Sequence, residues 1–314
     1  MKAITLSTFG DIENLQIKEI PVPEIVANEV LVEVKSISIN PVDVKSRQGK
    51  GMAGRLKGLD PLILGWDISG IVTETKSSQF NVGDSVFGMV NFPGHGQAYA
   101  EYVAAPASQL AIKPANINFN DAAAATLAAL TAWQALVVHA KVQKGQRVLI
   151  HAAAGGVGHY AVQLAKYLGA YVIGTSSANN KDFVLSLGAD EHIDYMLKPF
   201  EEQTSDIDFV LDTIGGENID RSLKIVKKGG TLITIPSGLS DGVAEKGQAA
   251  GINAFFFLVS SNGEHMQEIA ALLEKGILKS YVSDVFPFGK MGEAHLQVES
   301  GRTRGKVIVS TDIR

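Results

Sequence analysis

The sequence predicts an α/β protein in which a doubly wound parallel sheet is enclosed by two β-rich segments. Residues 29–39 alternate between apolar and polar side chains, as a half-buried strand does. After Pro114 the pattern changes to apolar strands that alternate with helices, which is typical of a parallel sheet covered on both faces. A glycine-rich turn joins the strand that begins at Arg147 to the next helix.

The order of these patterns predicts two domains. We expect a β-rich domain formed by residues 1–115 and 276–314, and a dinucleotide-binding domain formed by residues 116–275. The tail after residue 276 returns to mixed strand and helix and is expected to rejoin the first domain. In the central part we expect helices at 121–140, 157–168, 181–189, 219–230 and 266–275, and strands at 147–153, 171–177, 208–216, 231–238 and 253–260.

Composition excludes several classes of protein. The net charge of −5 argues against a nucleic-acid partner, because phosphate contacts need basic surface. The chain has no cysteine, which excludes disulfides, thiolate catalysis and Cys-ligated zinc. Its apolar runs are too short to cross a bilayer, and the first ten residues do not resemble a signal peptide. We therefore expect a cytoplasmic protein without a membrane partner.

The glycine turn is the strongest local signal. A Rossmann turn follows the pattern GxGxxG, and here Ala153 replaces the first glycine. The second glycine lets the backbone approach a pyrophosphate, and the third lets the helix pack closely on the strand. Backbone N–H groups at the start of the helix then face the phosphates. We expect cofactor contacts from Gly155, Gly156, Val157 and Gly158.

Cofactor preference is expected to be set about 20 residues further along the chain. At that point NAD-binding enzymes carry an acidic residue that holds the ribose. This chain has Thr175, Ser176 and Ser177 instead, with Lys181 just beyond. Hydroxyl groups and a cation favour a 2′-phosphate, so the sequence predicts NADPH as the cofactor. The alternative is a solvated polar loop with an incidental lysine.

Nine segments in order make the chain similar to the medium-chain dehydrogenase/reductase superfamily, in its zinc-free quinone oxidoreductase branch. The resemblance covers essentially the whole chain and implies a GroES-like β-barrel domain split around a Rossmann domain. The segments are INPVDVKSRQG (39–49), LGWDISGIV (64–72), FNVGDSVFG (80–88), AYAEYVAAP (98–106), LAALTAWQAL (127–136), AAAGGVG (152–158), LGADEHIDY (187–195), DTIGG (212–216) and RGKVIV (304–309).

The resemblance also bears on zinc. Metal-dependent relatives carry a cysteine at the position of Asn40, a His-Glu pair at Trp66-Asp67, and a second cysteine near Leu127. Only Asp67 is a potential ligand, and one carboxylate does not make a zinc site. The expected reaction is hydride transfer from NADPH to a quinone or an α,β-unsaturated carbonyl, whose developing negative charge needs hydrogen-bond donors.

The resemblance further suggests roles for single residues. Asn40 and Asp43 are expected at the active site: Asn40 would donate to the substrate oxygen and Asp43 would organise the loop. The alternatives are a turn starter and a helix cap. Thr131 is expected near the nicotinamide, or else as a helix-interior threonine. Tyr195 is expected near the adenosine ribose, or else as a surface aromatic. Lys306 is expected to be a solvated charge, with a position at the cofactor cleft as the alternative.

Phe255, Phe256 and Phe257 form an apolar strand that is expected at the edge of the sheet, in the core and at a homodimer interface. Either Phe256 or Phe257 is expected on its exposed face. Two other functions stay open. One is a 2-enoyl-thioester reductase, although Gly51 occupies the position where such relatives carry a tyrosine. The other is a non-catalytic NADPH-binding scaffold.

Overall fold

The computed structural model describes residues 1–312 and divides the chain into two compact units. The split unit comprises residues 1–130 together with the chain from residue 260 onward, and the central unit comprises residues 131–259. The two boundaries lie about 15 residues inside the expected ones. Their position follows from packing within the split unit, because α3 (Phe119–Ala124) packs on β3, β4 and β15, and α9 (Gly263–Glu274) packs on β7.

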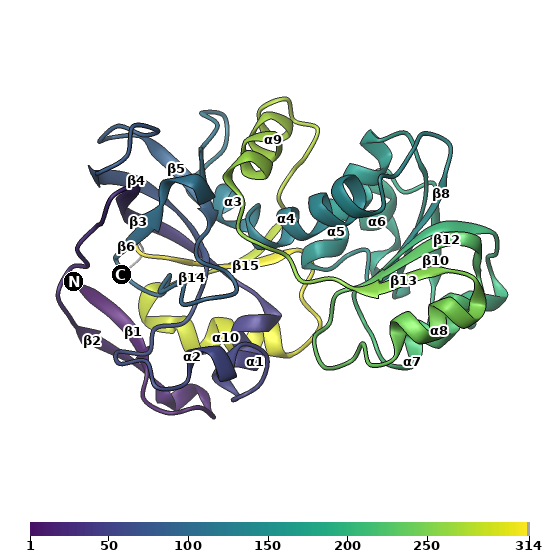
Figure 1. Cartoon of the computed structure of the whole chain (residues 1–314), viewed down its shortest axis with the longest axis horizontal. Helices are drawn as coiled ribbons and strands as arrows, with labels where there is room; N and C mark the ends of the chain where they lie inside the picture. Colours follow the sequence, from purple (N-terminus) through teal and green to yellow (C-terminus); the bar gives the residue numbers. More distant parts are fainter. Residues whose placement is uncertain (313–314) are drawn as a thin grey trace. The chain divides into compact units, whose positions relative to one another are not determined.

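The split unit is built on a seven-stranded sheet of order β14-β15-β3-β4-β5-β7, and β6 also pairs with β3 (Figure 1). In β3 burial alternates only from Val32 to Lys35, where Val32 and Val34 are buried and Glu33 and Lys35 are half-buried. The rest of the strand departs from the alternation expected there, since Ser36 and Ser38 are buried as well. The strands are β1 (Lys2–Leu6), β2 (Leu15–Glu19), β3 (Glu29–Ile39), β4 (Asp67–Thr75), β5 (Ser85–Met89), β6 (Tyr102–Pro106), β7 (Leu110–Ile112), β14 (Val282–Pro287) and β15 (Lys306–Ser310). The remaining helices are α1 (Pro41–Arg47), α2 (Ala53–Leu56) and α10 (Met291–Glu299).

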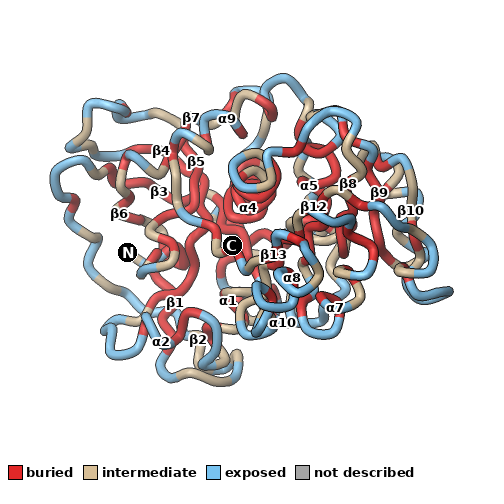
Figure 2. The backbone as a smooth tube through the Cα atoms, turned by 45° about the vertical axis from the view of Figure 1, so that its right-hand side comes forward, coloured by how far each residue is buried: buried red, intermediate tan, exposed pale blue. Residues whose placement is uncertain are grey.

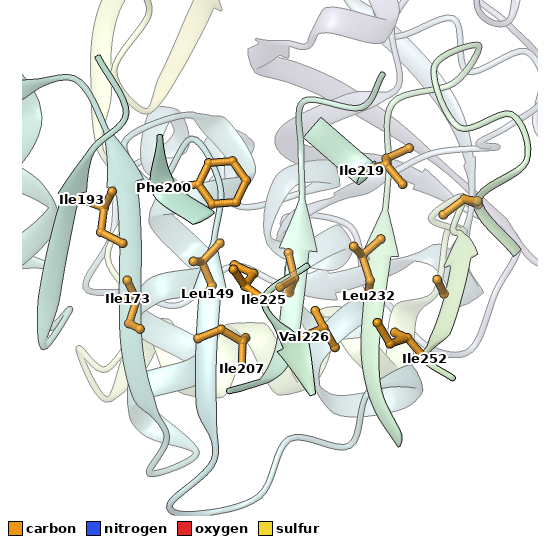
Figure 3. Packing of buried hydrophobic residues seen from close by; sticks show 13 residues of the cluster. Leu149, Ile173, Ile193, Phe200, Ile207, Ile219, Ile225, Val226, Leu232 and Ile252 are labelled. Atoms are coloured by element: carbon orange, nitrogen blue, oxygen red, sulfur yellow. The ribbon is translucent and has the colours of Figure 1, made fainter. Parts of the chain in front are cut away.

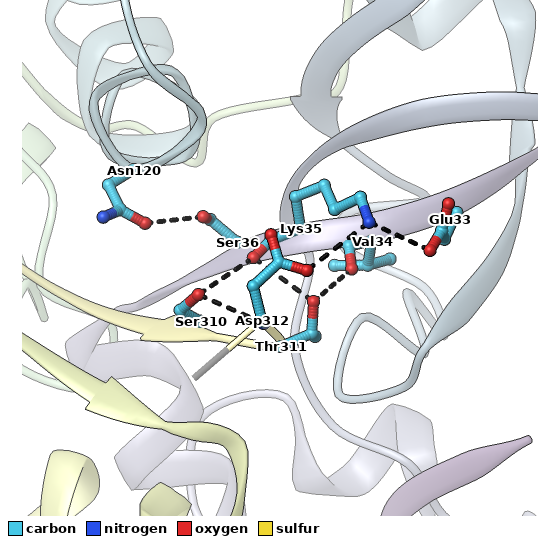
Figure 4. Close-up of polar contacts among 8 residues, drawn as sticks. All are labelled: Glu33, Val34, Lys35, Ser36, Asn120, Ser310, Thr311 and Asp312. Carbon is cyan, nitrogen blue, oxygen red and sulfur yellow. Dashed lines mark hydrogen bonds and ion pairs between the residues drawn. The ribbon is translucent and has the colours of Figure 1, made fainter. Parts of the chain in front are cut away.

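The C-terminal segment completes this sheet, as the sequence predicts. Strand β15 pairs antiparallel with β3, from Val307 opposite Ile39 to Ser310 opposite Ser36. Figure 4 shows the contacts at the end of this pairing, where the Lys35 ammonium lies 2.9 Å from a Glu33 carboxylate oxygen and 3.4 Å from one of Asp312. Residues distant in sequence therefore meet where the end of β15 lies beside the middle of β3.

The central unit is a six-stranded sheet in which all strands are parallel, with the order β10-β9-β8-β11-β12-β13. This is the order of a doubly wound dinucleotide-binding sheet, with its switch point between β8 and β11. The predicted α/β class is confirmed. The strands are β8 (Arg147–Ile150), β9 (Tyr171–Ser176), β10 (Glu191–Asp194), β11 (Ile207–Asp212), β12 (Val226–Thr234) and β13 (Asn253–Phe256). The connecting helices are α5 (Gly156–Tyr167), α6 (Lys181–Ser186), α7 (Glu217–Leu223) and α8 (Val243–Ala250).

Apolar side chains hold this sheet to its helices. Leu149, Ile173 and Leu232 from three strands pack in one cluster with Phe200 and Ile219, and all five are almost completely buried (Figure 3). The strands of the central sheet and α4 (Leu127–Trp133) are largely buried, whereas the loops are exposed (Figure 2). No helix within residues 1–312 is long and apolar enough to cross a membrane.

Three expected elements differ in the structure. The single helix expected at 121–140 is divided into α3, α4 and a π-helical segment, Gln134–His139. The helix expected at 219–230 ends at Leu223, and β12 begins at Val226. Its Lys-Lys-Gly-Gly stretch belongs to the strand, with Gly229 at a φ of +77°. The expected strand 253–260 ends at Phe256.

The edge strand corrects one further expectation. β13 is the last strand in the order of the central sheet, as predicted. The rings of Phe255 and Phe257 both pack on the His139 ring, with centroids 5.9 and 4.7 Å away, so they lie on one face of the strand. Phe256 points the other way and is 38% exposed, whereas Phe257 is 7% exposed. Because side chains alternate along a strand, only Phe256 belongs to the exposed face, and Phe257 does not.

Candidate functional site

The glycine turn lies where strand and helix meet, as predicted. β8 ends at Ile150 and α5 begins at Gly156, with Gly155 as its N-cap. No side chain caps this helix, so the first backbone N–H groups have no partner within it. Gly156, Val157 and Gly158 form the first turn of the helix. Such a helix start binds anions, because its N–H groups and the positive end of its dipole point outward.

Close packing around the turn explains its small residues. A Cβ atom at Gly158 would overlap the carbonyl oxygen of Ala152, and one at Gly174 of β9 would press on Val184. Ala152 has a φ of +47°, which bends the chain sharply between β8 and α5. The helix α5 therefore packs too closely on the turn for a side chain at Gly158, as the third glycine of a dinucleotide-binding turn requires. The turn fits a dinucleotide cofactor.

The end of β9 does not bring the three predicted hydroxyl groups together. Thr175 is buried and its Oγ1 lies 3.0 Å from His151 Nδ1, on one face of the sheet. Ser176 points to the other face, where its Oγ lies 2.8 Å from His192 Nε2. Alternation along the strand causes this separation. Ser177 and Lys181 follow, and Lys181 is exposed at the start of α6.

His151 is a buried residue that sequence reasoning missed. Its Nε2 lies 3.0 Å from Ser222 Oγ, and its ring packs on Phe200 with centroids 4.6 Å apart. Burial lowers the pKa of His151 to about 4, so the ring is neutral at pH 7. The side chain therefore ties the residue just before the glycine turn to β9 and, through Ser222, to α7.

Asp212 organises the loop after β11. Its carboxylate is buried and accepts hydrogen bonds from the backbone N–H groups of Ile214 and Gly215, from Asn218 Nδ2 and from Thr234 Oγ1. The sequence pattern DTIGG is evident, but these four donors become visible only in the structure. The loop lies at the carboxyl end of the sheet, where doubly wound proteins bind their ligands.

The other two predicted cofactor residues lie in different surroundings. Thr131 is buried in α4. Tyr195 is 51% exposed in the turn after β10 and is followed by exposed Met196 and Leu197. Neither position tests the expected contact, and both assignments stay predictions.

In the split unit, Asn40 and Asp43 begin α1. Asn40 is the N-cap residue and forms a capping box with Asp43, whose Oδ2 accepts a hydrogen bond of 2.7 Å from the Asn40 backbone N–H. Capping, weighed above as the alternative for Asp43, is therefore what this side chain does in the structure. Two such mutual bonds satisfy N–H groups that would otherwise be buried without partners.

Two charged groups orient the side-chain amide of Asn40. Its Nδ2 donates to Asp67 Oδ2 over 2.8 Å, and its Oδ1 accepts from the ammonium group of Lys306. The antiparallel register explains this contact, since Val307 pairs with Ile39 and so Lys306 lies beside Asn40. Lys306 is 3% exposed, so the expectation of a solvated lysine is wrong. The second amide hydrogen faces Ser38 O at 3.5 Å, which is too long for a good hydrogen bond.

Burial shifts the ionisation of this cluster. The pKa of Asp43 is raised to about 7 by burial and by the nearby charge of Asp67. Burial also raises the pKa of Asp67 and lowers that of Lys306. One buried ammonium therefore faces two buried carboxyl groups, which are coupled through Asn40.

A second buried pair lies beside this cluster. Tyr99 Oη lies 2.8 Å from His295 Nε2, and burial raises the pKa of Tyr99 and lowers that of His295 to about 3. Arg47, also buried, donates to Glu299 Oε2 over 2.8 Å. These residues come from distant segments, and their sequence neighbourhoods carry no signal that joins them.

The positions that bind zinc in relatives are used differently here. Trp66 Nε1 donates to Gly94 O over 2.7 Å, and Asp67 Oδ1 accepts from the backbone N–H of Leu127 over 3.1 Å. Within residues 1–312, no three His, Asp or Glu side chains are grouped as a metal site. Metal independence stays a prediction.

Comparisons with known proteins agree with both units. Residues 26–115 match the family of alcohol dehydrogenase GroES-like domains, and residues 187–309 match the family of zinc-binding dehydrogenases. A mitochondrial NAD(P)H oxidoreductase of Mus musculus is 34% identical over 326 residues, which cover 90% of this chain and 82% of the relative. An NADPH-dependent alkenal/one oxidoreductase of chloroplasts from Arabidopsis thaliana is 34% identical over 324 residues, which cover 98% of this chain and 79% of the relative.

A solved structure shows the same fold. The quinone oxidoreductase from Coxiella burnetii is 37% identical and superposes with a TM-score of 0.94, covering 99% of both chains. Together with the match over residues 26–115, this likeness confirms the expected GroES-like domain and Rossmann sheet.

Proposed function

Since the chain belongs to the medium-chain dehydrogenase/reductase superfamily, in its branch of quinone oxidoreductases and alkenal/one reductases, we propose that it reduces quinones or α,β-unsaturated carbonyls with NADPH, without zinc. As a member of this branch it is an NAD(P)H-dependent oxidoreductase. The preference for NADPH, the substrate class and the absence of zinc are the proposal. The match named for zinc-binding dehydrogenases begins at residue 187, beyond Asn40, Trp66 and Leu127.

The polar end of β9 is the observation that carries the cofactor assignment. Ser176 ends the strand, Ser177 follows it and Lys181 begins α6, so the segment holds hydroxyl groups and a cation where an NAD-binding enzyme holds a carboxylate. The relative from Arabidopsis thaliana is described as NADPH-dependent, which supports this choice. Thr175 is a weaker candidate than its neighbours, because its hydroxyl lies against His151.

The chain's own residues bind and orient the reactants. The N–H groups of Gly156, Val157 and Gly158 would hold the pyrophosphate, and Ser176 with Lys181 would hold the 2′-phosphate. When bound, NADPH supplies the hydride. In the split unit, Lys306 and Asp67 fix the orientation of the Asn40 amide. We assign its weakly bonded second N–H as the donor to the substrate oxygen, where negative charge develops during transfer.

Turnover measurements distinguish the proposed function from the two alternatives. A 2-enoyl-thioester reductase would need a proton donor where this chain has Gly51, which has a φ of +56° that strains any tyrosine placed there. A scaffold would bind NADPH without turnover. Steady-state NADPH oxidation with a panel of quinones, enones, enoyl thioesters and alcohols, in the presence of a strong chelator, separates these functions. We expect turnover of quinones or enones only. Loss of activity that only a divalent metal restores, or efficient oxidation of alcohols, would contradict the proposal.

Cofactor preference has its own test in paired dissociation constants for NADPH and NADH. A charge-assisted hydrogen bond contributes about 1.5–3 kcal/mol, which corresponds to a factor of about 10 to 100. Lys181→Ala should therefore weaken NADPH binding by about that factor and leave NADH nearly unchanged. Ser176→Asp should reverse the preference by placing a negative charge against the phosphate. Equal weakening of both cofactors by Lys181→Ala would refute the assignment.

The catalytic proposal for Asn40 is tested by separating turnover from binding. Asn40→Ala should lower kcat more than it weakens NADPH binding, because the amide acts mainly on the charge that builds in the transition state. Equal losses would make Asn40 a structural residue, as its cap position alone would suggest.

We further propose a homodimer through β13 and a cytoplasmic location.

A further inference from the structure

Polar side chains from two neighbouring strands meet at the carboxyl end of the central sheet. Ser176 ends β9, and His192 lies on β10, with its Nε2 2.8 Å from Ser176 Oγ. β10 runs parallel to β9, so that His192 pairs with Gly174 and Asp194 with Ser176. Lys181, at the start of α6, acts electrostatically on the imidazole. His192 therefore lies beside the residues assigned to the 2′-phosphate, although the sequence analysis did not single it out.

Three groups face this imidazole. Burial and the positive charge of Lys181 lower the pKa of His192, and the negative charge of Asp194 on the same strand opposes them. Ser176, on β9, is neutral. The net effect lowers the pKa from its usual range. The ring is therefore neutral at pH 7, and its Nε2 can accept the hydroxyl hydrogen of Ser176.

We propose that His192 is a further specificity-determining residue, which binds the 2′-phosphate of NADPH as an imidazolium, so that binding takes up one proton. The inference rests on the NADPH preference proposed above and adds a residue and a pH dependence to it. A phosphate monoester carries a charge of about −1.5 to −2 at pH 7. An opposite charge within hydrogen-bonding range raises the pKa of an imidazole by about 1–3 units, which opposes the effect of burial and Lys181 on His192.

Protonation also changes what Ser176 can do. Both nitrogens of an imidazolium are donors, so Nε2 can no longer accept a hydrogen from Ser176. Ser176 Oγ then accepts from His192, and its own hydrogen is left to donate to the phosphate. In the tautomer with an unprotonated Nε2, neutral His192 accepts the Ser176 hydrogen, whereas the imidazolium leaves that hydrogen to Ser177 O, 3.2 Å away, or to the phosphate. Protonation of His192 also adds one positive charge near the phosphate, which opposes the negative charge of Asp194.

The test is the pH dependence of binding of 2′,5′-ADP, with 5′-AMP as the matched ligand that lacks the 2′-phosphate. Isothermal titration calorimetry between pH 6.5 and 8.5 avoids the range below about pH 6, where the ligand phosphate itself takes up a proton. The affinity for 2′,5′-ADP should fall as the pH rises, by about ten-fold for each pH unit between 6.5 and the pKa of His192 in the complex. The affinity for 5′-AMP should stay constant.

Two variants separate His192 from Lys181. His192→Gln can still bond to Ser176 but cannot become charged, so its affinity for 2′,5′-ADP should be independent of pH and equal to the alkaline value of the wild type. Lys181→Met should weaken binding at every pH and keep the slope. A proton NMR titration of the wild-type His192 ring needs no variant: 2′,5′-ADP should raise its pKa by about one unit or more, and 5′-AMP should not.

The outcomes distinguish this inference from the proposed function. If 2′,5′-ADP binds more tightly than 5′-AMP but without pH dependence, or if His192→Gln keeps the slope, the role of His192 is refuted and the NADPH preference stands. An unchanged His192 pKa in the NMR titration refutes it equally. If 2′,5′-ADP binds no more tightly than 5′-AMP at any pH, the cofactor assignment and this inference both fail.

Discussion

The two candidate sites are built from different materials. In the central unit the proposed cofactor site consists mainly of backbone N–H groups, glycines and hydroxyls, with the exposed Lys181, and comes from two short stretches, residues 151–158 and 174–181. In the split unit the site is a buried cluster of charged groups that includes Asp43, Asp67 and Lys306. A site made from backbone is encoded locally, whereas a buried charge cluster depends on strands that the fold brings together.

Two of the three buried histidines, His151 and His295, differ in their hydrogen-bond partners. Both nitrogens of His151 lie within 3.0 Å of hydroxyl oxygens, from Thr175 and Ser222. His295 is held through Nε2 by Tyr99, and Arg47 lies close enough to lower its pKa further. Charged groups act on both rings: Asp212, Glu201 and Arg221 on His151, and Arg47 on His295.

The largest effect is expected from removing the cation of the split unit. Lys306→Met keeps the length of the side chain but leaves Asp67 and Asp43 buried without their positive partner. Breaking one side of a buried ion pair costs about 3–5 kcal/mol. We expect the free energy of unfolding, measured by chemical denaturation, to fall by about this amount.

The control for Lys306 is an exposed lysine of the central unit. Lys246 lies 2.8 Å from Asp220, and both side chains are well exposed. Exposed pairs of this kind contribute about 0–1 kcal/mol, so Lys246→Met should change stability little. If the two variants lose the same amount of stability, the charge cluster is not the feature that distinguishes the split unit.

The glycine turn is expected to respond to a single methyl group. Gly158→Ala places a Cβ against the carbonyl oxygen of Ala152, so the turn must shift. Such overpacking costs about 1–3 kcal/mol, and cofactor binding should weaken by about ten-fold or more. Gly54→Ala, in α2, is the control, because its Cβ would meet nothing within 4 Å and its φ is not positive. That change should be neutral or stabilise by about 0.5–1 kcal/mol.

Acidification should change the stability of the two units in different ways. The folded-state pKa of His151, about 4, lies below its unfolded value of about 6.5, so the unfolded chain binds more protons between them. The contribution of His151 to the stability of the central unit is therefore complete above about pH 6.5. It falls by about 2 kcal/mol between pH 7 and 5. In the split unit the raised pKa of Asp43 has the opposite effect, because the folded chain then binds more protons than the unfolded chain. The contribution of Asp43 to stability grows as the pH falls from about 7 and offsets the loss that His295 causes.

Hydrogen exchange resolved by strand measures this difference. After correction for the intrinsic rates, amides of β8, β9 and β11 should lose protection from pH 7 to 5, whereas those of β3 and β4 should change much less. His151→Gln, which removes the titrating ring, should flatten the profile of the central unit. An equal loss of protection in both units would show that these groups do not determine the acid response.

Much of the fold follows from local patterns. The alternation in residues 29–39 and the turn at Gly155–Gly158 predict their elements because one short segment contains the whole signal. The split-unit cluster could not be predicted in the same way, because Lys306 meets Asn40 only through the pairing of β15 with β3. The strand at Lys227 and Lys228 was missed because two lysines before two glycines resemble the end of a helix. The run of hydroxyl residues suggests one site for Thr175 and Ser176, but alternation along the strand places their side chains on opposite faces.

The smallest effect on stability, with a clear effect on assembly, is expected at the edge strand β13. Phe256 is on the exposed face, opposite the Phe255 and Phe257 rings that pack on His139. Phe256→Glu buries no charge in the monomer, so the monomer should lose no more than about 0.5 kcal/mol. An exposed apolar edge strand favours pairing with a second copy, and the two carboxylates, one from each copy, should prevent it.

The assembly of the purified protein is measured by sedimentation velocity at micromolar concentration. Wild type should sediment as a dimer and Phe256→Glu as a folded monomer that still binds NADPH. Phe257→Glu is the matched comparison: it places a carboxylate at a buried position, so it should destabilise the central unit itself by several kcal/mol rather than only separate the subunits. A monomeric wild type, or a dimer unaffected by Phe256→Glu, would mean that β13 ends the sheet without serving as an interface.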